Sequence, residues 1–346
     1  MTDISVIIPV YNGEKWINNC MKSIASQTII DTDTKLEIVV FNDGSIDDSE
    51  KLLAKWQEYF SSRSVNFVLT GSTLSKGVGA AKNGAVKKSC GTFLCFQDID
   101  DLMHPDRIML QWKYANINRN TLVGSRVCRV PVNSTPRFVG WANSLTPEQL
   151  KLQIYMSYGP TLLMPTWFCH KSVYEKVGGF NESGLGTPED LIFFYNHVDL
   201  GGDLHRIDEE LVIYTYHVSA TTFSVKRELI WQIQLERLQA IVLSKWTKFM
   251  VWNAGKSGRK FVRALSSENL KKVTAFCDVD VKKIGRTNEL YCPIKRAVIK
   301  KIPVIHFTSA RPPLVICVKL DLTKGQFENN LKSLNLKEGE DYILFS

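Results

Sequence analysis

The feature that most restricts the fold of this chain is a regular alternation of apolar runs with amphipathic helical stretches. Residues 4–10 (ISVIIPV) and 36–43 (LEIVVFND) have the composition of buried strands, and residues 66–70 and 92–98 continue the series. Helix-like stretches separate them. A β-α-β-α order predicts a mostly parallel, doubly wound α/β sheet. Between the first two strands, one helical stripe carries the apolar side chains of Trp16, Ile17, Cys20, Met21 and Ile24.

Polar clusters follow two of these strands at the point where each strand ends. NDGS occupies residues 42–45, and QDIDD occupies residues 97–101. Sheets of this kind bind ligands outside the carboxyl ends of their strands, near the place where the strand order reverses. We therefore expect the ligand site at this edge of the sheet.

The second cluster places three carboxylates directly after a buried strand: Asp98, Asp100 and Asp101. Two carboxylates one residue apart can hold a hard divalent cation such as Mg²⁺ or Mn²⁺, usually together with phosphate oxygens of a substrate. Without a cation, like charges this close are unfavourable. The alternative is a solvated Asp-rich turn in which Asp101 or Asp106 caps the next helix.

Two Thr-Pro segments predict helix starts in the less regular middle of the chain. Thr146 has the position of an N-cap, Pro147 that of the first helical residue, and Gln149 completes a capping box. Thr187 and Pro188 repeat the pattern. We expect a helix to begin at each segment.

The length of 346 residues suits two domains, and the pattern predicts where they divide. We expect a larger domain over residues 1–225, a linking helix over 226–248, and a smaller Rossmann-like α/β domain over 249–346. In the smaller domain a strand, a glycine turn and a helix follow one another in KFMVWNAGKSGRKFVRAL.

Basic charge is concentrated in that smaller domain. The chain has 43 Lys and Arg against 35 Asp and Glu, a net charge of +8. From residue 249 onward there are 18 basic and 9 acidic residues, so the preceding 248 residues are nearly neutral. One interpretation is an anionic partner such as nucleic acid, and the other is a soluble basic surface without a partner.

Cysteines and hydropathy indicate the compartment. The eight cysteines are scattered through apolar segments without a C-x-x-C pair, which favours reduced thiols over disulfides or a zinc site. No run of about 18 apolar residues is present, and the first residues lack the basic start of a signal peptide. These features predict a cytoplasmic protein that does not use a membrane, and they indicate no obligate protein partner.

Four segments in order resemble the inverting family 2 glycosyltransferases of the GT-A fold: SVIIPVYNGEKWINNCMKSI, IVVFNDGSIDDS, GVGAAKNGA and FQDIDDLMHPDRI. The resemblance spans about residues 3–225 and implies a mixed GT-A sheet, a UDP-sugar donor and Mn²⁺ or Mg²⁺. It implies that Asp43 accepts a hydrogen bond from uracil and that Asp100 carries the metal. The nucleotide-sugar contacts that it implies are Pro9, Val10, Tyr11, Asp43, Lys82 and Asp98.

The resemblance also implies an acidic catalytic base, which GTPEDLIFF supplies as Asp190 or, as second choice, Glu189. A base that removes the proton of an acceptor hydroxyl contributes about 10²–10⁴ in rate. The structural alternative is that these acids only stabilise the first turn of a helix. His217, in YTYHVSAT, matches a residue near the metal or diphosphate, and its alternative is a structural histidine.

The smaller domain contains a segment that resembles a dinucleotide-binding fingerprint. In VWNAGKSGRKF, Asn253 replaces the first glycine, and Gly255 and Gly258 fit the others. Asp278 or Asp280 follows at about the spacing of a ribose-binding acid. The alternatives are a nucleotide site and an inherited fold without a cofactor. We favour the second, because glycosyl transfer needs no redox cofactor.

Further segments, among them SLTPEQL, GPTLLMPTWFC, VTAFCDVD and ARPPLVICVKLDLT, resemble the queuosine-tRNA galactosyltransferases. This implies UDP-galactose as donor and the cyclopentenediol of queuosine in the tRNA-Tyr anticodon as acceptor. Two alternatives stay open: a UDP-N-acetylglucosamine-dependent transferase acting on a glycan or glycolipid, and a non-catalytic nucleotide-binding protein. By charge, the candidate RNA contacts are Lys256, Arg259, Lys260, Lys271 and Lys272.

Overall fold

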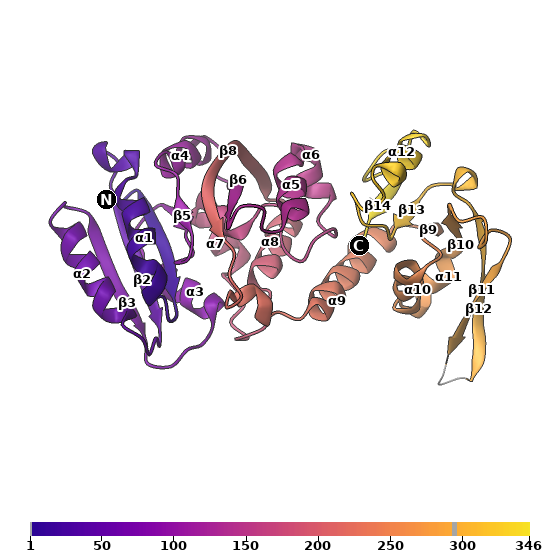
Figure 1. The fold of residues 1–346 in the computed structure, drawn as a ribbon, viewed down its shortest axis with the longest axis horizontal. Helices are drawn as coiled ribbons and strands as arrows, with labels where there is room; N and C mark the ends of the chain where they lie inside the picture. Colours follow the sequence, from indigo (N-terminus) through magenta and orange to yellow (C-terminus); the bar gives the residue numbers. More distant parts are fainter. Residues whose placement is uncertain (1, 293–295) are drawn as a thin grey trace. The chain divides into compact units, whose positions relative to one another are not determined.

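The computed structural model describes residues 2–292 and 296–346, and the chain forms two compact units (Figure 1). Unit 1 consists of Met1–Lys151 and Gly159–Lys226, and unit 2 consists of Leu152–Tyr158 and Arg227–Ser346. Each unit is built on its own sheet. The sequence predicts domains over residues 1–225 and 249–346. These limits stay a prediction, because a compact unit need not fold independently.

The sheet of unit 1 is mixed and follows the strand order β3-β2-β1-β4-β7-β6-β8-β5. The first four strands in this order are parallel, β7 is antiparallel to both of its neighbours, β6 and β8 are parallel, and β5 is antiparallel to β8. This confirms the expected α/β fold with a mixed sheet. The strands are β1 (Ile4–Val10), β2 (Leu36–Asp43), β3 (Asn66–Ser72), β4 (Phe93–Phe96), β5 (Leu102–Met103), β6 (Thr121–Val130), β7 (Phe168–His170) and β8 (Asp203–Thr215).

Helices connect most of these strands (Figure 1). The helix after β1 buries Ile17, Cys20, Met21 and Ile24, as the apolar stripe predicts. Short 3₁₀ turns at Thr28–Asp31, Met164–Thr166 and Thr221–Ser224 complete the unit. The helices are α1 (Glu14–Ala25), α2 (Ser49–Ser61), α3 (Val78–Lys88), α4 (Arg107–Ile117), α5 (Pro136–Ser144), α6 (Pro147–Leu152), α7 (Lys171–Val177) and α8 (Glu189–Asp199).

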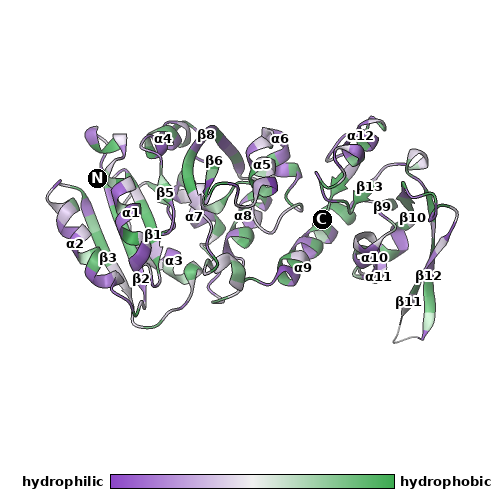
Figure 2. Ribbon diagram, viewed as in Figure 1, coloured by the Kyte–Doolittle hydropathy of each residue, from purple (hydrophilic) through white to green (hydrophobic). Residues whose placement is uncertain are grey.

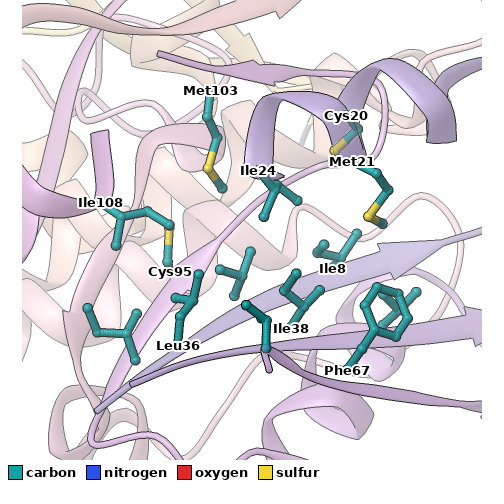
Figure 3. Close-up of a cluster of buried hydrophobic side chains, with 14 of the residues drawn as sticks. Ile8, Cys20, Met21, Ile24, Leu36, Ile38, Phe67, Cys95, Met103 and Ile108 are labelled. Carbon is teal, nitrogen blue, oxygen red and sulfur yellow. The ribbon is translucent and has the colours of Figure 1, made fainter. Parts of the chain in front are cut away.

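The core of unit 1 surrounds β1, whose seven residues are all buried. A strand covered on both faces reads as a continuous apolar run rather than an alternating one, which explains ISVIIPV. Figure 3 shows Ile8 of β1 and Ile38 of β2 beside Met21 and Ile24 of α1. In Figure 2, β1 is coloured as hydrophobic, whereas α2 carries many hydrophilic residues. The core therefore fixes the strand ends that carry the polar clusters.

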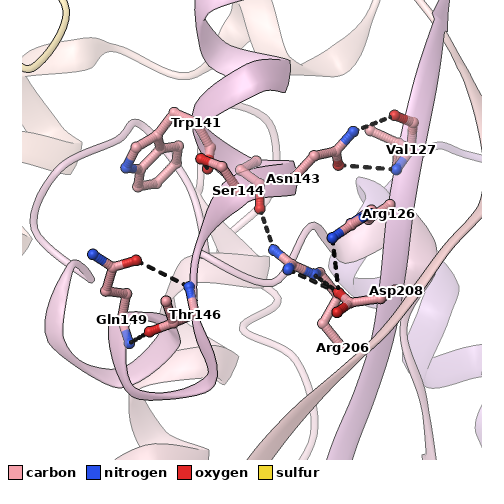
Figure 4. Close-up of polar contacts among 10 residues, drawn as sticks. Arg126, Val127, Trp141, Asn143, Ser144, Thr146, Gln149, Arg206 and Asp208 are labelled. Carbon is pink, nitrogen blue, oxygen red and sulfur yellow. Dashed lines mark hydrogen bonds and ion pairs between the residues drawn. The ribbon is translucent and has the colours of Figure 1, made fainter.

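A helix begins at both Thr-Pro segments, as expected, but the predicted capping residue is confirmed only at α6. Thr146 donates its backbone N–H to Gln149 Oε1 over 2.9 Å, and its hydroxyl accepts from the Gln149 N–H over 3.3 Å (Figure 4). At α8 the N-cap is Pro188, and no side chain caps the helix. The helix starts one residue later than Thr187 predicts, so Glu189 and Asp190 form its first turn.

Unit 2 contains a second α/β sheet in the order β11-β12-β10-β9-β13-β14, parallel except for the β11–β12 hairpin. None of the helices in the described parts of the chain combines the length and hydropathy that crossing a membrane requires. The strands are β9 (Phe249–Trp252), β10 (Val273–Asp278), β11 (Thr287–Cys292), β12 (Ala297–His306), β13 (Leu314–Ile316) and β14 (Tyr342–Leu344), and the helices are α9 (Arg227–Leu238), continued as a π-helix over Gln239–Leu243, α10 (Lys256–Arg263), α11 (Ser267–Lys272) and α12 (Gln326–Lys332).

The turn between β9 and α10 has the backbone shape expected of the glycine-rich segment. Asn253 adopts φ 104°, in the region that an asparagine tolerates better than most residues. A Cβ atom at Gly258 would collide with the carbonyl oxygen of Asn253, so only glycine lets α10 pack this closely on β9. Asp278 accepts the Ala254 N–H over 2.9 Å and Lys283 Nζ over 3.1 Å. Asp278, one of the two candidates for a ribose-binding acid, therefore makes hydrogen bonds within the protein. Nucleotide binding by this segment stays a prediction.

Candidate functional site

The acidic turn after β4 forms a compact cluster of carboxylates. One oxygen from each of Asp98, Asp100 and Asp101 lies within 4.8 Å of the others. Asp101 is fully buried, accepts the Thr215 N–H over 2.7 Å through Oδ1, and has no hydrogen-bond partner at Oδ2 among the described residues. The interpretation of Asp101 as a mere turn or cap residue is therefore wrong, because the turn folds its side chain into the cluster.

A buried network fixes the shape of this turn. Gln97 donates from Nε2 to the carbonyl oxygens of Asp98, over 2.8 Å, and Asp101, over 2.9 Å. Its own Oε1 accepts from Nη1 of Arg107 over 2.6 Å, and that guanidinium also donates to the carbonyl of Phe96 over 2.8 Å. The sequence did not reveal Arg107 as a supporting residue, since its side chain reaches the turn only through the packing of α4.

His217 completes the cluster from the end of β8. Its Nε2 lies 2.7 Å from Oδ2 of Asp100, and its Nδ1 lies 2.9 Å from the hydroxyl of Ser219. The ring also contacts the indole of Trp16, with centroids 5.0 Å apart. The structure thus brings together Asp100 and His217, which are separated by more than one hundred residues in the chain. Trp16, expected only as part of an apolar stripe, is a neighbour of the site.

The cluster fits a hard divalent cation. It offers carboxylate oxygens and one imidazole nitrogen, which are ligands that Mn²⁺ and Mg²⁺ accept. Burial, followed by the charges of Asp100 and Asp98, raises the pKa of Asp101 well above its ordinary value. The N–H of Thr215 and the charge of Arg129 oppose this rise but do not cancel it. A buried oxygen without a hydrogen-bond partner beside two carboxylates is an environment that a further cation compensates. Binding of the metal by Asp100 and His217 stays a prediction.

A second group of charged side chains joins α3 to the first turn of α8. Lys82 Nζ donates to Glu189 Oε1 over 2.9 Å, and both side chains are almost completely buried. Burial acts to lower the pKa of Lys82, but the carboxylates of Glu189, Asp98 and Asp190 outweigh it and raise that pKa. Glu189 therefore serves as the counterion of Lys82, which leaves Asp190 better placed to accept a proton.

Asp190 has the environment of a carboxylate tuned toward neutral pH. Burial, and then the charge of Glu189, raises its pKa to about 7. Its Oδ1 accepts the Leu191 N–H over 2.7 Å. Burial also raises the pKa of Asp98, to about 6, with Lys82 opposing the shift. These mutual effects place Asp98, Lys82 and Asp190 in one electrostatic neighbourhood.

The expected nucleotide contacts lie at the ends of β1 and β2. Pro9 and Val10 are buried in β1, where they pair in register with Phe41 and Asn42 of β2. Tyr11 follows with 55% of its surface exposed, so its ring is open for contact. The positions suit a base and ribose lying across the strand ends, and the contacts themselves stay a prediction.

Asp43 is engaged more fully by the protein than the sequence indicated. It is buried, and both oxygens accept hydrogen bonds over 2.7–3.2 Å. The donors are the hydroxyl of Ser72 at the end of β3 and, in the loop after it, the hydroxyl of Ser75 and the N–H groups of Lys76 and Gly77. The carboxylate thus braces this loop. A hydrogen bond from uracil stays a prediction, and it would add to an already satisfied group.

The five basic residues proposed from charge lie on α10 and α11 of unit 2, but they differ in how far the protein itself engages their charged groups. Lys260 pairs with Glu228 over 3.0 Å, and its Nζ lies 3.8 Å from the centroid of the Trp231 ring. Lys272 donates to the carbonyl of Leu243 over 2.7 Å and is largely buried. Lys256, Arg259, Lys260 and Lys271 are all exposed. Arg263, which the charge pattern did not single out, continues the α10 face at helical spacing: Lys256, Arg259, Lys260 and Arg263.

Comparisons with known proteins show that the chain is similar to glycosyltransferases. Chondroitin synthase of Escherichia coli is 37% identical over 252 residues, which cover 70% of this chain and 34% of that protein. An uncharacterized glycosyltransferase of Rickettsia typhi is 25% identical over 307 residues, covering 81% of this chain and 89% of its own. The alignments of the first curated relatives span about a fifth to a third of the length of those proteins.

Solved structures and a family description give the same result for the fold. Residues 1–349 of Staphylococcus aureus TarS, in complex with UDP-GlcNAc, match with a TM-score of 0.55 at 18% identity, covering 76% of this chain and 70% of that one. The family description "Glycosyl transferase family 2" matches residues 5–178, which contain the acid cluster and Lys82. The match extends over half of the sequence, so the chain belongs to glycosyl transferase family 2.

Proposed function

We propose that the protein is an inverting, metal-dependent glycosyltransferase that uses a UDP-sugar. The observation that carries this proposal is the proximity of two groups: the acid cluster with His217, and Asp190 beside the Lys82–Glu189 pair. One group suits the diphosphate of a donor, and the other suits proton removal from an acceptor. Family membership supports the same reaction class.

In this proposal Asp190 is the general base. An acceptor hydroxyl is a poor nucleophile until its proton is taken, and a single displacement at the anomeric carbon inverts the configuration there. A carboxylate with a pKa of about 7 is ionised in part at neutral pH and still basic enough to accept that proton. The Lys82–Glu189 pair holds the first turn of α8, and with it Asp190, in place.

The donor would lie across the ends of β1, β2 and β4. Tyr11 offers an exposed ring for the base, and Pro9 and Val10 fix its position from β1. In this proposal Asp98 and Lys82 contact the ribose and the sugar. Asp100 and His217 would hold the metal, and Asp101 belongs to the same acid cluster. When bound, a divalent cation offsets the negative charge of the departing diphosphate.

For the acceptor we propose the cyclopentenediol of queuosine in the tRNA-Tyr anticodon, with galactose as the sugar. The resemblance to the queuosine-tRNA galactosyltransferases and the basic excess after residue 249 support this proposal. Phosphate contacts from Lys and Arg position RNA without reading its sequence, which suits the exposed face of α10. Action on tRNA implies that the protein works in the cytoplasm.

A second candidate is transfer to a glycan or a polymer. The relatives named chondroitin synthase and poly(ribitol-phosphate) beta-glucosyltransferase favour it. The second is an enzyme of Bacillus spizizenii that is 26% identical over 161 residues. This candidate predicts sugar transfer that responds neither to tRNA nor to moderate salt. A non-catalytic nucleotide-binding protein is the third candidate, and it predicts UDP-sugar binding without turnover.

The test is incubation of the full chain with bulk tRNA and either UDP-galactose or UDP-N-acetylglucosamine, in the presence of Mn²⁺ or Mg²⁺. Nucleoside mass spectrometry should reveal a galactosylated queuosine. We expect Asp190→Asn to lower the rate by about 10²–10⁴, because it removes the base without changing the shape of the side chain. Unchanged transfer by this variant would remove Asp190 from its role.

Two controls make the result specific. Chelation of divalent cations should abolish transfer, and Mn²⁺ or Mg²⁺ should restore it. Transfer of N-acetylglucosamine to an added glycan, with no product on tRNA, would establish the second candidate instead.

A further inference from the structure

A cationic side chain that takes no part in the proposed reaction lies close to the acid cluster. Arg129 is in β6, and its register partner in the neighbouring parallel strand β8 is Tyr214. The guanidinium carbon lies 3.8 Å from the centroid of the Tyr214 ring and 5.5 Å from that of Tyr216. Tyr216 is tied to β6 by its N–H, which donates to the carbonyl of Val130 over 2.7 Å, and it directly precedes His217.

The two tyrosine rings hold the guanidinium of Arg129 in place, and its N–H groups donate no hydrogen bond in doing so. Its Nε is buried and unpartnered, no hydrogen bond or ion pair of this side chain is found in the described parts of the chain, and its charge acts on the carboxylate of Asp101. A guanidinium that stacks on an aromatic ring is attracted through the flat face of the guanidinium. The N–H groups at the edge of the guanidinium therefore stay free. The buried Nε carries that cost itself, whereas the terminal Nη groups are not among the buried unpartnered atoms and are open to the acceptors of a ligand.

Exposed aromatic rings border this cation. Tyr216 is 36% exposed and Phe223 is 54% exposed, and the two rings meet edge to face with centroids 5.8 Å apart. One further contact links the group to the acid cluster: the backbone N–H of Thr215, between Tyr214 and Tyr216, donates to Asp101 over 2.7 Å. A free guanidinium and open rings therefore lie next to the proposed centre of reaction.

The strand order indicates which substrate this group faces. The strands that carry the expected nucleotide contacts Pro9, Val10 and Asp43, which are β1 and β2, lie on one side of β4 in the sheet. β6 and β8 lie on the other side. The acid turn after β4 thus separates the donor strands from Arg129 and Tyr216. On this side an acceptor can approach without displacing the donor.

We propose that Arg129, Tyr216 and Phe223 bind a single-stranded nucleotide of the RNA acceptor, an inference that rests on the proposed function. Arg129 donates to a backbone phosphate, and a base stacks on the exposed aromatic rings. RNA loops offer unstacked bases and phosphates at this spacing, and proteins recognise such loops by aromatic and arginine stacking. A phosphate supplies the acceptors that the Arg129 edge lacks.

The test uses the full chain and an anticodon stem–loop RNA that carries queuosine, with binding followed by fluorescence anisotropy over a range of salt concentrations. Arg129→Gln should weaken binding about tenfold and lower the salt slope by about 0.7, the share of one phosphate contact on a single strand. Tyr216→Ala should weaken binding about tenfold, whereas Tyr216→Phe, which keeps the ring, should bind nearly as the wild type does.

The matched control is Arg126→Gln. Arg126 is in the same strand, its Nε is also unpartnered, and its Nη2 pairs with Asp208 over 3.5 Å (Figure 4). It is not part of the proposed group, so its replacement should leave RNA binding unchanged. Arg129→Lys keeps the charge but not the planar fork, and it should fall between the wild type and Arg129→Gln. Thermal unfolding of each variant shows whether it folds.

The outcomes separate this inference from the proposed function. Wild-type affinity in a folded Arg129→Gln variant overturns the inference alone. A higher KM for UDP-galactose with RNA binding unchanged also overturns it, because Arg129 would then serve the donor. If the wild type binds the RNA through Arg129 but transfers no sugar to it, the proposed function fails and the inference stands. If the wild type does not bind the RNA, both fail.

Discussion

At the residue scale, burial decides how the carboxylates of unit 1 behave. Asp190 and Asp98 both have pKa values above that of a carboxylate in water, and in both cases burial is the largest cause. The neighbouring Glu189 is paired with Lys82 instead. Two adjacent acids in one helical turn thus have different environments, and this difference favours Asp190 over Glu189 as the base.

The raised pKa of Asp190 predicts how activity depends on pH. A general base has to be ionised, so kcat should fall below about pH 7, by about tenfold for each pH unit once most of the group is protonated. The measurement is kcat between pH 5.5 and 8.5 at saturating donor and acceptor. The residual activity of Asp190→Asn serves as the control and should lack this dependence. An unchanged kcat down to pH 6 would contradict the assignment.

The raised pKa of Asp190 also predicts how the stability of the fold depends on pH. Because the fold raises the pKa of Asp190, ionisation of this group disfavours the folded state, so its contribution to the free energy of unfolding decreases as pH rises from about 4 to about 7. Asp190→Asn cannot ionise. Its melting temperature should exceed that of the wild type at pH 8, and the difference should shrink at pH 5. Thermal unfolding by circular dichroism checks both values.

At the scale of secondary-structure elements, β1 is the element that holds the site in register. It lies between β2 and β4, and the polar clusters follow both of these neighbours. Its side chains are packed on both faces, so a shift by one residue would exchange side chains of different size between two close-packed layers. The acid turn and the loop braced by Asp43 therefore depend on the packing of this strand.

We expect Ile8→Ala in β1 to lower the free energy of unfolding by about 2–5 kcal/mol, the usual cost of truncating a buried isoleucine. The matched control is Ile117→Ala. That side chain, at the end of α4, is 82% exposed, and its truncation should cost less than about 0.5 kcal/mol. Urea unfolding of both variants gives the comparison. Equal destabilisation would mean that β1 is not part of the central core.

At the scale of the whole molecule, charge is divided unevenly between the two parts of the chain. Residues from 249 onward carry twice as many basic as acidic side chains, and the earlier residues are close to neutral. The exposed cations of α10 contribute to this excess. An RNA acceptor bound by such a surface should dissociate as the salt concentration rises, because binding releases counterions from the RNA phosphates.

The double variant Arg259→Glu/Arg263→Glu should weaken tRNA binding and reduce its salt dependence, by about 0.7–0.9 in slope for each phosphate that the variant no longer neutralises. The matched control is Lys51→Glu/Lys55→Glu, which makes the same charge change at the same spacing on α2 of unit 1. Filter binding between 50 and 300 mM salt measures both. An equal effect of the two variants would show that only net charge matters.

The sequence alone determined the α/β class, the first four strands of unit 1 (β1 to β4) and the apolar stripe of α1. These features follow from local hydrophobic periodicity, which the chain carries wherever it folds. It also placed Asp98, Asp100 and Asp190 correctly as acids at element ends. It missed where α8 begins, since Thr187 fits an N-cap pattern that Pro188 occupies in the structure.

Only the tertiary structure decided which side chains meet. It placed Asp101 in the cluster, paired Glu189 with Lys82 and His217 with Asp100, and used Lys272 within the fold. It also stacked Arg129 against Tyr214 and Tyr216. These contacts join residues far apart in the chain, and their energies depend on burial and distance. Burial and distance are defined only once the sheet has formed. Local sequence patterns could therefore name the candidate site residues but could not choose among them.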